Sequence, residues 1–247
     1  MYVKRISLDR AKVKSKTDYP FSIPVIQNFE QLEIENNVTF FVGENGSGKS
    51  TLLEAIADKC GFHTAGGGRN NSYDAEATQS DLGDYVTLSW LPKITNGFFL
   101  RAETFHQFAT YIDSLEDDPF SSSTKYEAYG EDSLHHQSHG ESFLSLFQNR
   151  FHQQAIYLLD EPEAALSPQR QLAFLRILHE LASSGQCQFI IATHSPILLG
   201  YPDAKIWSFD DEQIAEVKYE DTDHYQITRL FLDNRERMLS ELFKEKE

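Results

Sequence analysis

A glycine-rich segment near the start of the chain constrains the fold more than any other feature. Residues 43–50 read G-E-N-G-S-G-K-S, which matches the pattern G-x-x-x-x-G-K-[S/T] without a gap. The apolar run Val38 to Val42 precedes this segment, and apolar residues at helical spacing follow it between Ser50 and Cys60. Between a strand and a helix, such glycines let successive backbone N–H groups point at phosphate oxygens, and the helix amino terminus adds partial positive charge. The segment therefore predicts a phosphate-binding loop within an α/β fold.

The residue types in this loop predict a site for ATP and Mg²⁺. We expect Lys49 to reach the β- and γ-phosphates and the Ser50 hydroxyl to bind Mg²⁺. Thr51 is expected at the α-phosphate. The remaining positions would line the phosphates with backbone N–H groups: Gly43, Glu44, Asn45, Gly46, Ser47 and Gly48. An accidental glycine-rich turn is the alternative, but a chance match at every fixed position is rare in a chain of 247 residues.

Two adjacent acids end a second apolar segment. The run from Ala155 to Leu159 is apolar and of strand length, and Asp160 and Glu161 follow it directly. Ligands of α/β sheets bind at the carboxyl ends of the strands, so Asp160 is expected to hold Mg²⁺ opposite Ser50, directly or through water. Glu161 would orient and polarise the water that attacks the γ-phosphate. A solvated turn is the ordinary explanation for such a pair, but the phosphate loop in the same chain favours the catalytic one.

The sequence around these acids is similar to that of one class of ATPase. Residues 158–167, L-L-D-E-P-E-A-A-L-S, resemble the Walker B segment and D-loop of ABC-class ATPases. His194 follows the buried strand 189–192 and matches the switch histidine of that class, which implies contact with the γ-phosphate and the attacking water. Ser167 and Pro168 are also a favourable N-cap and first residue of a helix, and this role is compatible with a D-loop.

A candidate for the ABC signature segment reads S-H-G-E-S at residues 138–142. The resemblance implies that Ser138 and Gly140 complete the ATP site of a second copy, so that two chains pack head to tail around two ATP molecules. The same S-x-x-E pattern is a capping box at the start of a helix. His139 stands where transporter subunits usually carry glycine. The Ser-x-Gly-Glu pattern is more similar to soluble ATPases of the Rad50, SMC and RecF type.

Buried strands that alternate with helices predict an α/β sheet with parallel strands in the middle. Together with this pattern, the resemblance implies a single ABC-type ATPase domain, a P-loop NTPase, over residues 1–247. Its central sheet should be mostly parallel with an antiparallel β portion, and a helical subdomain with the signature should be inserted at about residues 98–150. An amphipathic helix is expected at 227–243. The apolar runs are far shorter than the roughly 20 residues that cross a bilayer, and the first residues lack the apolar core of a signal peptide. We therefore expect a cytoplasmic protein without membrane insertion.

Three uses of ATP hydrolysis remain open: a switch that acts on an unidentified protein partner, Rad50- or RecF-like action on DNA, and service as the ATP-binding subunit of a transporter. The net charge of −16 disfavours DNA, because proteins bind phosphate backbones mainly through basic surfaces. The atypical signature disfavours the transporter subunit. The residue of the Q-loop (Glu103 or Gln107) and the side chain that stacks on adenine (Tyr19 or Phe21) also remain open.

Overall fold

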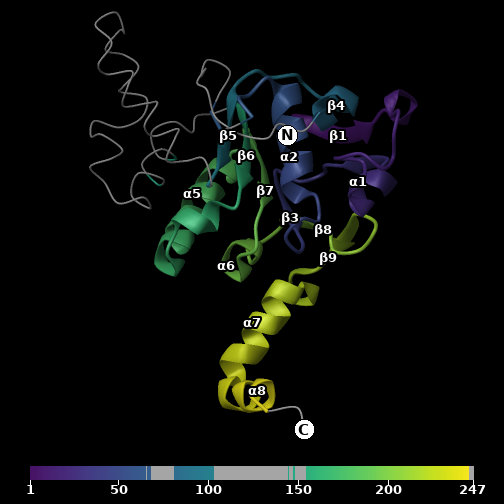
Figure 1. The fold of residues 1–247 in the computed structure, drawn as a ribbon. Helices are drawn as coiled ribbons and strands as arrows, with labels where there is room; N and C mark the ends of the chain where they lie inside the picture. The colour runs from purple at the N-terminus through teal and green to yellow at the C-terminus, as the bar shows by residue number, and fades with distance from the viewer. Residues whose placement is uncertain (65, 68–80, 103–143, 145–146, 148–153, 245–247) are drawn as a thin grey trace, which may run out of the picture.

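The computed structural model describes residues 1–64, 66–67, 81–102, 144, 147 and 154–244. Within these ranges the larger of two sheets has the strand order β5-β6-β7-β3-β8-β9 (Figure 1). The bounds of its strands are Gly97–Arg101 (β5), Ala155–Asp160 (β6), Cys187–Ala192 (β7), Val38–Val42 (β3), Lys205–Ser208 (β8) and Ala215–Val217 (β9). Neighbouring strands from β5 to β8 are parallel, and β9 is antiparallel to β8. The structure confirms the predicted α/β fold with a mostly parallel sheet.

A smaller antiparallel sheet lies beside it, with the strand order β2-β1-β4. Its strands are Gln31–Glu33 (β2), Val3–Leu8 (β1) and Val86–Trp90 (β4). The buried amide of Gln188, in β7, joins the two sheets. Its Oε1 accepts hydrogen bonds from the N–H groups of Tyr2 and Val3, and its Nε2 donates to the carbonyl of Val3. This sheet is the predicted antiparallel portion of the fold.

Helices cover both faces of the central sheet, because its strands are apolar on both sides. Phe41 of β3 packs with the apolar side chains of α2 (Lys49–Cys60), whereas the neighbouring Phe40 packs with those of α5 (Pro168–Ser183). This alternation follows from the period of two along a strand. Cys60 and Cys187 are buried, and neither belongs to a disulfide.

The described part of the chain also contains several shorter helices before residue 223. The α-helices are α1 (Pro24–Asn28) and α6 (Pro196–Leu199), and the 3₁₀ helices are η1 (Arg10–Lys12), η2 (Asp81–Tyr85), η4 (Pro162–Ala165) and η5 (Tyr219–Asp221). Ser167 caps α5 by accepting a hydrogen bond from the N–H of Arg170, as the sequence predicted. Within the described ranges, no helix has both the length and the apolar character that crossing a bilayer requires.

The single helix predicted for 227–243 is wrong. The structure has two helices there, α7 (Asp223–Asp233) and α8 (Arg235–Leu242), which project from the body of the molecule (Figure 1). The helix begins earlier than predicted because Thr222 caps it, and it is interrupted at Asn234, whose φ of −134° is not helical. Periodic apolar residues continue across this break, which is why the sequence pattern did not reveal it.

The predicted helical subdomain at about 98–150 overlaps the central sheet at its start. Residues 98–101 belong to β5, which pairs with β6, so a subdomain can begin only after Arg101. Most of the predicted segment lies outside the described residues. Leu144 and Phe147, which are described, are helical, and the ring of Phe147 packs against that of Phe174 in α5 at 4.8 Å.

Candidate nucleotide-binding site

The candidate site lies at the carboxyl edge of the central sheet, where three parallel strands end. The phosphate loop follows β3, Asp160 ends β6, and His194 comes shortly after the end of β7. The register aligns these ends, because Phe41 of β3 and Asp160 of β6 both pair with Ala192 of β7. Ligands of parallel sheets bind at this edge. The sheet therefore brings together segments that are far apart in sequence.

Glycines with positive φ shape the loop between β3 and α2. Gly43 has a φ of +147°, and Gly48, the N-cap of α2, has a φ of +104°. Residues with a Cβ atom rarely adopt these angles. A Cβ atom at Gly43 would also lie 2.9 Å from Oδ1 of Asp210. The first N–H groups of α2 have no carbonyl partner within the helix, which makes them donors for an anion.

Lys49 is buried at the start of α2, with 4% of its surface exposed. Its Nζ donates hydrogen bonds to the carbonyl oxygens of Gly43 at 2.6 Å and Glu44 at 2.8 Å, so the ammonium lies against the loop that precedes it. Burial lowers the pKa of the Lys49 ammonium, and the negative charges of Glu161 and Asp160 act in the opposite sense. The structure thus places a cation at the loop, near two carboxylates.

Ser50 and Asp160 are distant in sequence but meet at the end of β6, where Ser50 Oγ donates to Asp160 Oδ1 at 2.9 Å. Mg²⁺ prefers oxygen ligands in octahedral geometry and often takes only one or two protein groups besides phosphates and water. Neighbouring ligands on such an ion are about 2.9 Å apart when the metal–oxygen bonds are about 2.0–2.1 Å. This hydroxyl and carboxylate therefore fit Mg²⁺. No group of three or more His, Cys, Asp or Glu residues in the described part could hold a metal, and a site of this kind requires none.

Asp160 is almost inaccessible to solvent and has a cation beside it. Burial raises its pKa to about 6, while the charge of Arg101 acts to lower it. Arg101 Nε lies 3.5 Å from Asp160 Oδ2, and Arg101 Nη1 lies 3.6 Å from Oε2 of Glu54 in α2. Sequence reasoning missed Arg101 and Glu54. The available signal was the position of Arg101 directly after the apolar residues 98–100.

Glu161 and His194 face each other at this edge, with His194 Nε2 at 3.4 Å from Glu161 Oε1. Glu161 has a φ of +52°, a left-handed conformation that is uncommon for residues other than glycine. Such strained residues cluster at functional sites. The N–H of His194 donates to Glu163 Oε1 at 2.5 Å. Burial lowers the pKa of His194, and the charge of Lys49 acts in the same sense, which favours the neutral imidazole at neutral pH.

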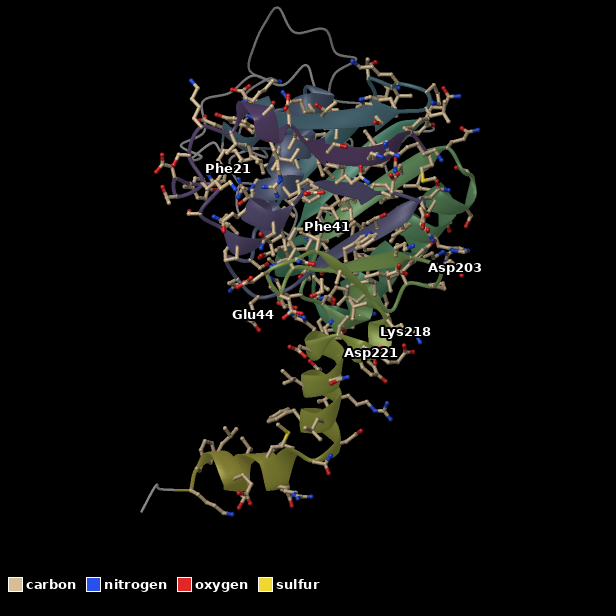
Figure 2. All side chains as sticks on the ribbon, turned by 90° about the vertical axis from the view of Figure 1, so that its right-hand side faces the viewer. Phe21, Phe41, Glu44, Asp203, Lys218 and Asp221 are labelled. Atoms are coloured by element: carbon tan, nitrogen blue, oxygen red, sulfur yellow. The ribbon has the colours of Figure 1, made fainter. Side chains whose placement is uncertain are left out.

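Two further side chains reach the site from elements that the sequence did not connect with it. His224, in α7, places its Nε2 at 2.8 Å from Nδ1 of His194. Asp210, after β8, accepts a hydrogen bond from the N–H of Glu44 at 2.6 Å. Figure 2 shows Glu44 at the edge of the body from which α7 projects. The spacing of His224 and Asp210 in the sequence does not connect them with the site. A histidine in an amphipathic helix and an acid in a hairpin turn are usually surface residues, so neither position indicated a role.

Some predicted site residues cannot be placed, and one aromatic candidate is wrong. The residues outside the described ranges are Ser138, Gly140, Glu103 and Gln107. Phe21 is buried and packs edge to face on Tyr85 at 4.9 Å, so it cannot stack on adenine without leaving the core. Tyr19 is 59% exposed, and its hydroxyl lies 3.5 Å from Oγ1 of Thr51.

Parts of the chain are similar to known proteins. Two family profiles match: one described as an AAA domain, putative AbiEii toxin, type IV toxin–antitoxin system, over residues 38–150, and one described as an AAA ATPase domain, over residues 133–199. The OLD nuclease of Thermus scotoductus is 52% identical over 40 residues, which are 16% of this chain and 8% of that protein. A putative ABC transporter ATP-binding protein of Staphylococcus aureus strain COL is 27% identical over 184 residues, 69% of this chain and 32% of that protein. The chain thus spans about a third or less of the length of these curated relatives.

Solved structures of ATP-binding cassettes share the fold. One cassette of an ABC transporter superimposes with a TM-score of 0.55 at 16% identity, covering 95% of this chain and 97% of that one. A nucleotide-free cassette from an ABC transporter gives a TM-score of 0.53 at 16% identity and covers both chains completely. At this identity the likeness concerns the fold alone. The chain therefore has the fold of an ABC-type ATP-binding cassette, and parts of its sequence are similar to AAA-type ATPase domains.

Proposed function

We propose that this chain hydrolyses Mg²⁺-bound ATP in a cycle that pairs and separates two copies of the domain. One observation carries the proposal: Lys49, the Ser50–Asp160 pair and the Glu161–His194 pair converge at one edge of the sheet. These segments come from three separate parts of the sequence. Their convergence supplies a cation, two hard oxygen ligands, a carboxylate for water and a neutral imidazole.

Each side chain has a distinct task in this proposal. Lys49 neutralises charge on the β- and γ-phosphates, which the N–H groups of the loop surround. Ser50 and Asp160 hold Mg²⁺, which supplies further charge neutralisation when it is bound. Glu161 accepts a hydrogen bond from the attacking water and orients it. His194 donates its Nε2–H toward the γ-phosphate.

The proposed pairing uses the signature segment of a second copy. Ser138 and Gly140 complete the ATP site of the other chain, as the resemblance to ABC-class ATPases suggests. ATP then holds the two copies together, and hydrolysis releases them. In this scheme the chemistry acts as a timed switch on a partner protein in the cytoplasm.

The test compares Glu161→Gln with wild type in the presence of MgATP. The variant should lose at least about a hundredfold in kcat, because a positioned general base contributes about 10²–10⁴. It should also elute as a dimer in gel filtration with light scattering, while the ADP-bound form stays monomeric. Glu180→Gln, on the exposed face of α5, is the matched control. A variant that remains monomeric with MgATP would exclude the pairing, and unchanged turnover in Lys49→Ala would exclude the site itself.

Action on DNA is the second candidate, and the match to the OLD nuclease of Thermus scotoductus favours it. The net charge of −16 opposes it. If the chain acts on DNA, duplex DNA should stimulate ATP turnover several-fold at about 0.15 M salt, a concentration that weakens nonspecific binding to phosphates.

The relatives named as putative ABC transporter ATP-binding proteins keep a transporter subunit as a third candidate. Co-purification with a membrane protein from the native host would favour that candidate.

A further inference from the structure

A second histidine contacts the candidate switch histidine. His224 belongs to the first turn of α7, and its Nε2 lies 2.8 Å from Nδ1 of His194. The two ring centroids are 4.9 Å apart. The other ring nitrogen of His194, Nε2, lies 3.4 Å from Glu161 Oε1. His194 is therefore held between α7 and the proposed catalytic carboxylate.

The contact between the two rings requires a proton on one of the facing nitrogens. If Nδ1 of a neutral His194 carried it, Nε2 of the same ring would present a lone pair to the Glu161 carboxylate, which is repulsive. If Nε2 of His224 carries it, Nδ1 of His194 is the acceptor and Nε2 of His194 is protonated. The second arrangement places one proton between each pair of facing atoms, so it is the one the geometry favours.

We propose that His224 is a positioning residue of this ATPase: it donates its Nε2–H to Nδ1 of His194 and thereby keeps the Nε2–H of His194 directed toward the reacting groups. The proposal rests on the proposed role of His194. It assigns His224 no contact with ATP. Its effect is on the tautomer and orientation of a neighbouring ring.

The start of α7 is attached to the segment that follows His194. The hydroxyl of Tyr219 donates to the carbonyl of Pro196 at 3.0 Å, and Pro196 is the first residue of α6. Thr222, which is 3% exposed, caps α7. These contacts fix the backbone of His224 next to the site. Farther along, α7 and α8 project from the body, as Figure 2 shows, and no described residue of either helix is buried.

Loss of the donor should slow turnover without weakening ATP binding. His224→Ala should lower kcat about tenfold and change KM less than about twofold, because partners that orient metal-ligating histidines contribute about 10–100-fold and we expect the lower end of that range for His194. His224→Gln retains an N–H donor and should recover most of kcat. Gln226→Ala, an exposed position of the same helix, should match wild type. Equal kcat in wild type and His224→Ala would overturn the proposal.

A double variant and a spectroscopic measurement separate positioning from a general effect on structure. In the His194→Ala background, His224→Ala should cause no further loss of kcat, because its effect passes through His194. A further tenfold loss there would overturn the proposal. Isotope-edited NMR of the histidine nitrogens, without nucleotide and near about pH 8, should show His194 protonated at Nε2 in wild type and a mixture of tautomers in His224→Ala. Protonation of His194 at Nδ1 in wild type would also overturn it.

Failure of this inference can be distinguished from failure of the proposed function. If His194→Ala keeps full kcat, the proposed role of His194 is wrong and the role of His224 falls with it. If His194→Ala lowers kcat while His224→Ala does not, only the positioning role is excluded.

Discussion

Replacement of Asp160 by Asn should stabilise the metal-free protein, although it alters the candidate Mg²⁺ site. The side chain of Asp160 is 7% exposed, and burial raises its pKa from the ordinary value of 3.8 to about 6. A pKa that is higher in the folded than in the unfolded state means that folding favours the protonated carboxyl. The stability that the protonated Asp160 carboxyl contributes is fully present below about pH 4 and is lost as the pH rises through about 6.

The magnitude follows from the two pKa values. Their difference of about 2.2 corresponds to about 3 kcal/mol, at about 1.4 kcal/mol for each tenfold change in an ionisation constant. Asn has the shape of the protonated carboxyl and does not ionise. In EDTA near about pH 7.5, Asp160→Asn should therefore exceed wild type in free energy of unfolding by up to about 3 kcal/mol. Near about pH 4.2 the difference should fall below about 1 kcal/mol.

Urea unfolding followed by circular dichroism measures both differences, at pH values on either side of the isoelectric point of about 4.9. Glu161→Gln is the control, because that side chain is 43% exposed and its replacement should change stability by less than about 0.5 kcal/mol. MgATP should then stabilise wild type more than Asp160→Asn. A variant that is less stable than wild type near about pH 7.5 would refute the reasoning. It would mean that Arg101 holds the ionised carboxylate more strongly than burial opposes it.

Three further predictions concern packing and the loop. Gln188→Leu should lower the free energy of unfolding by about 2–4 kcal/mol, because it removes three buried hydrogen bonds. If urea unfolding shows no larger loss of stability than for Gln226→Leu, at an exposed position, the prediction is wrong. Leu178→Ala, in the core, should lower the free energy of unfolding by about 2–5 kcal/mol. Leu172→Ala, at a position 60% exposed on the same helix, should lower it by less than about 1 kcal/mol. Equal losses of stability would mean that the buried face of α5 is misassigned. Gly48→Ala should weaken ATP binding about tenfold in an equilibrium titration, because its φ of +104° is costly for alanine; unchanged affinity would count against this loop geometry.

The strands and the phosphate loop could be predicted because they depend on local sequence. The apolar run at 155–159 became β6, which ends one residue later, and the strand expected at 189–192 became β7, which begins two residues earlier. The meeting of Ser50 with Asp160 also followed from sequence, because the carboxyl ends of parallel strands share one edge of a sheet. In these cases a short pattern and one topological rule were sufficient.

Contacts between distant elements could not be predicted in the same way. His224 is in an amphipathic segment, and nothing in its spacing from His194 indicates that the two rings meet. The break at Asn234 depends on backbone angles that a pattern of apolar residues does not record. The burial of Phe21 depends on the packing of Tyr85 from another part of the chain. Each case requires knowledge of which elements pack together.

Neighbouring elements affect the protonation of Asp160 and His194, the two titratable groups that the central sheet brings to the site. The register of β6 and β7 fixes the backbone of Asp160 and brings His194, just after β7, to the same edge. Burial raises the pKa of Asp160 while Arg101 of β5 acts to lower it, and His224 of α7 contacts His194. Mg²⁺ binds the ionised carboxylate, so below about pH 6 its binding would have to release a proton from Asp160. Near neutral pH, the bound metal would instead offset the cost of burying that charge. Binding of Mg²⁺ should therefore both stabilise the fold and complete the site, and changes in β5 or α7 could alter turnover while the phosphate loop stays the same.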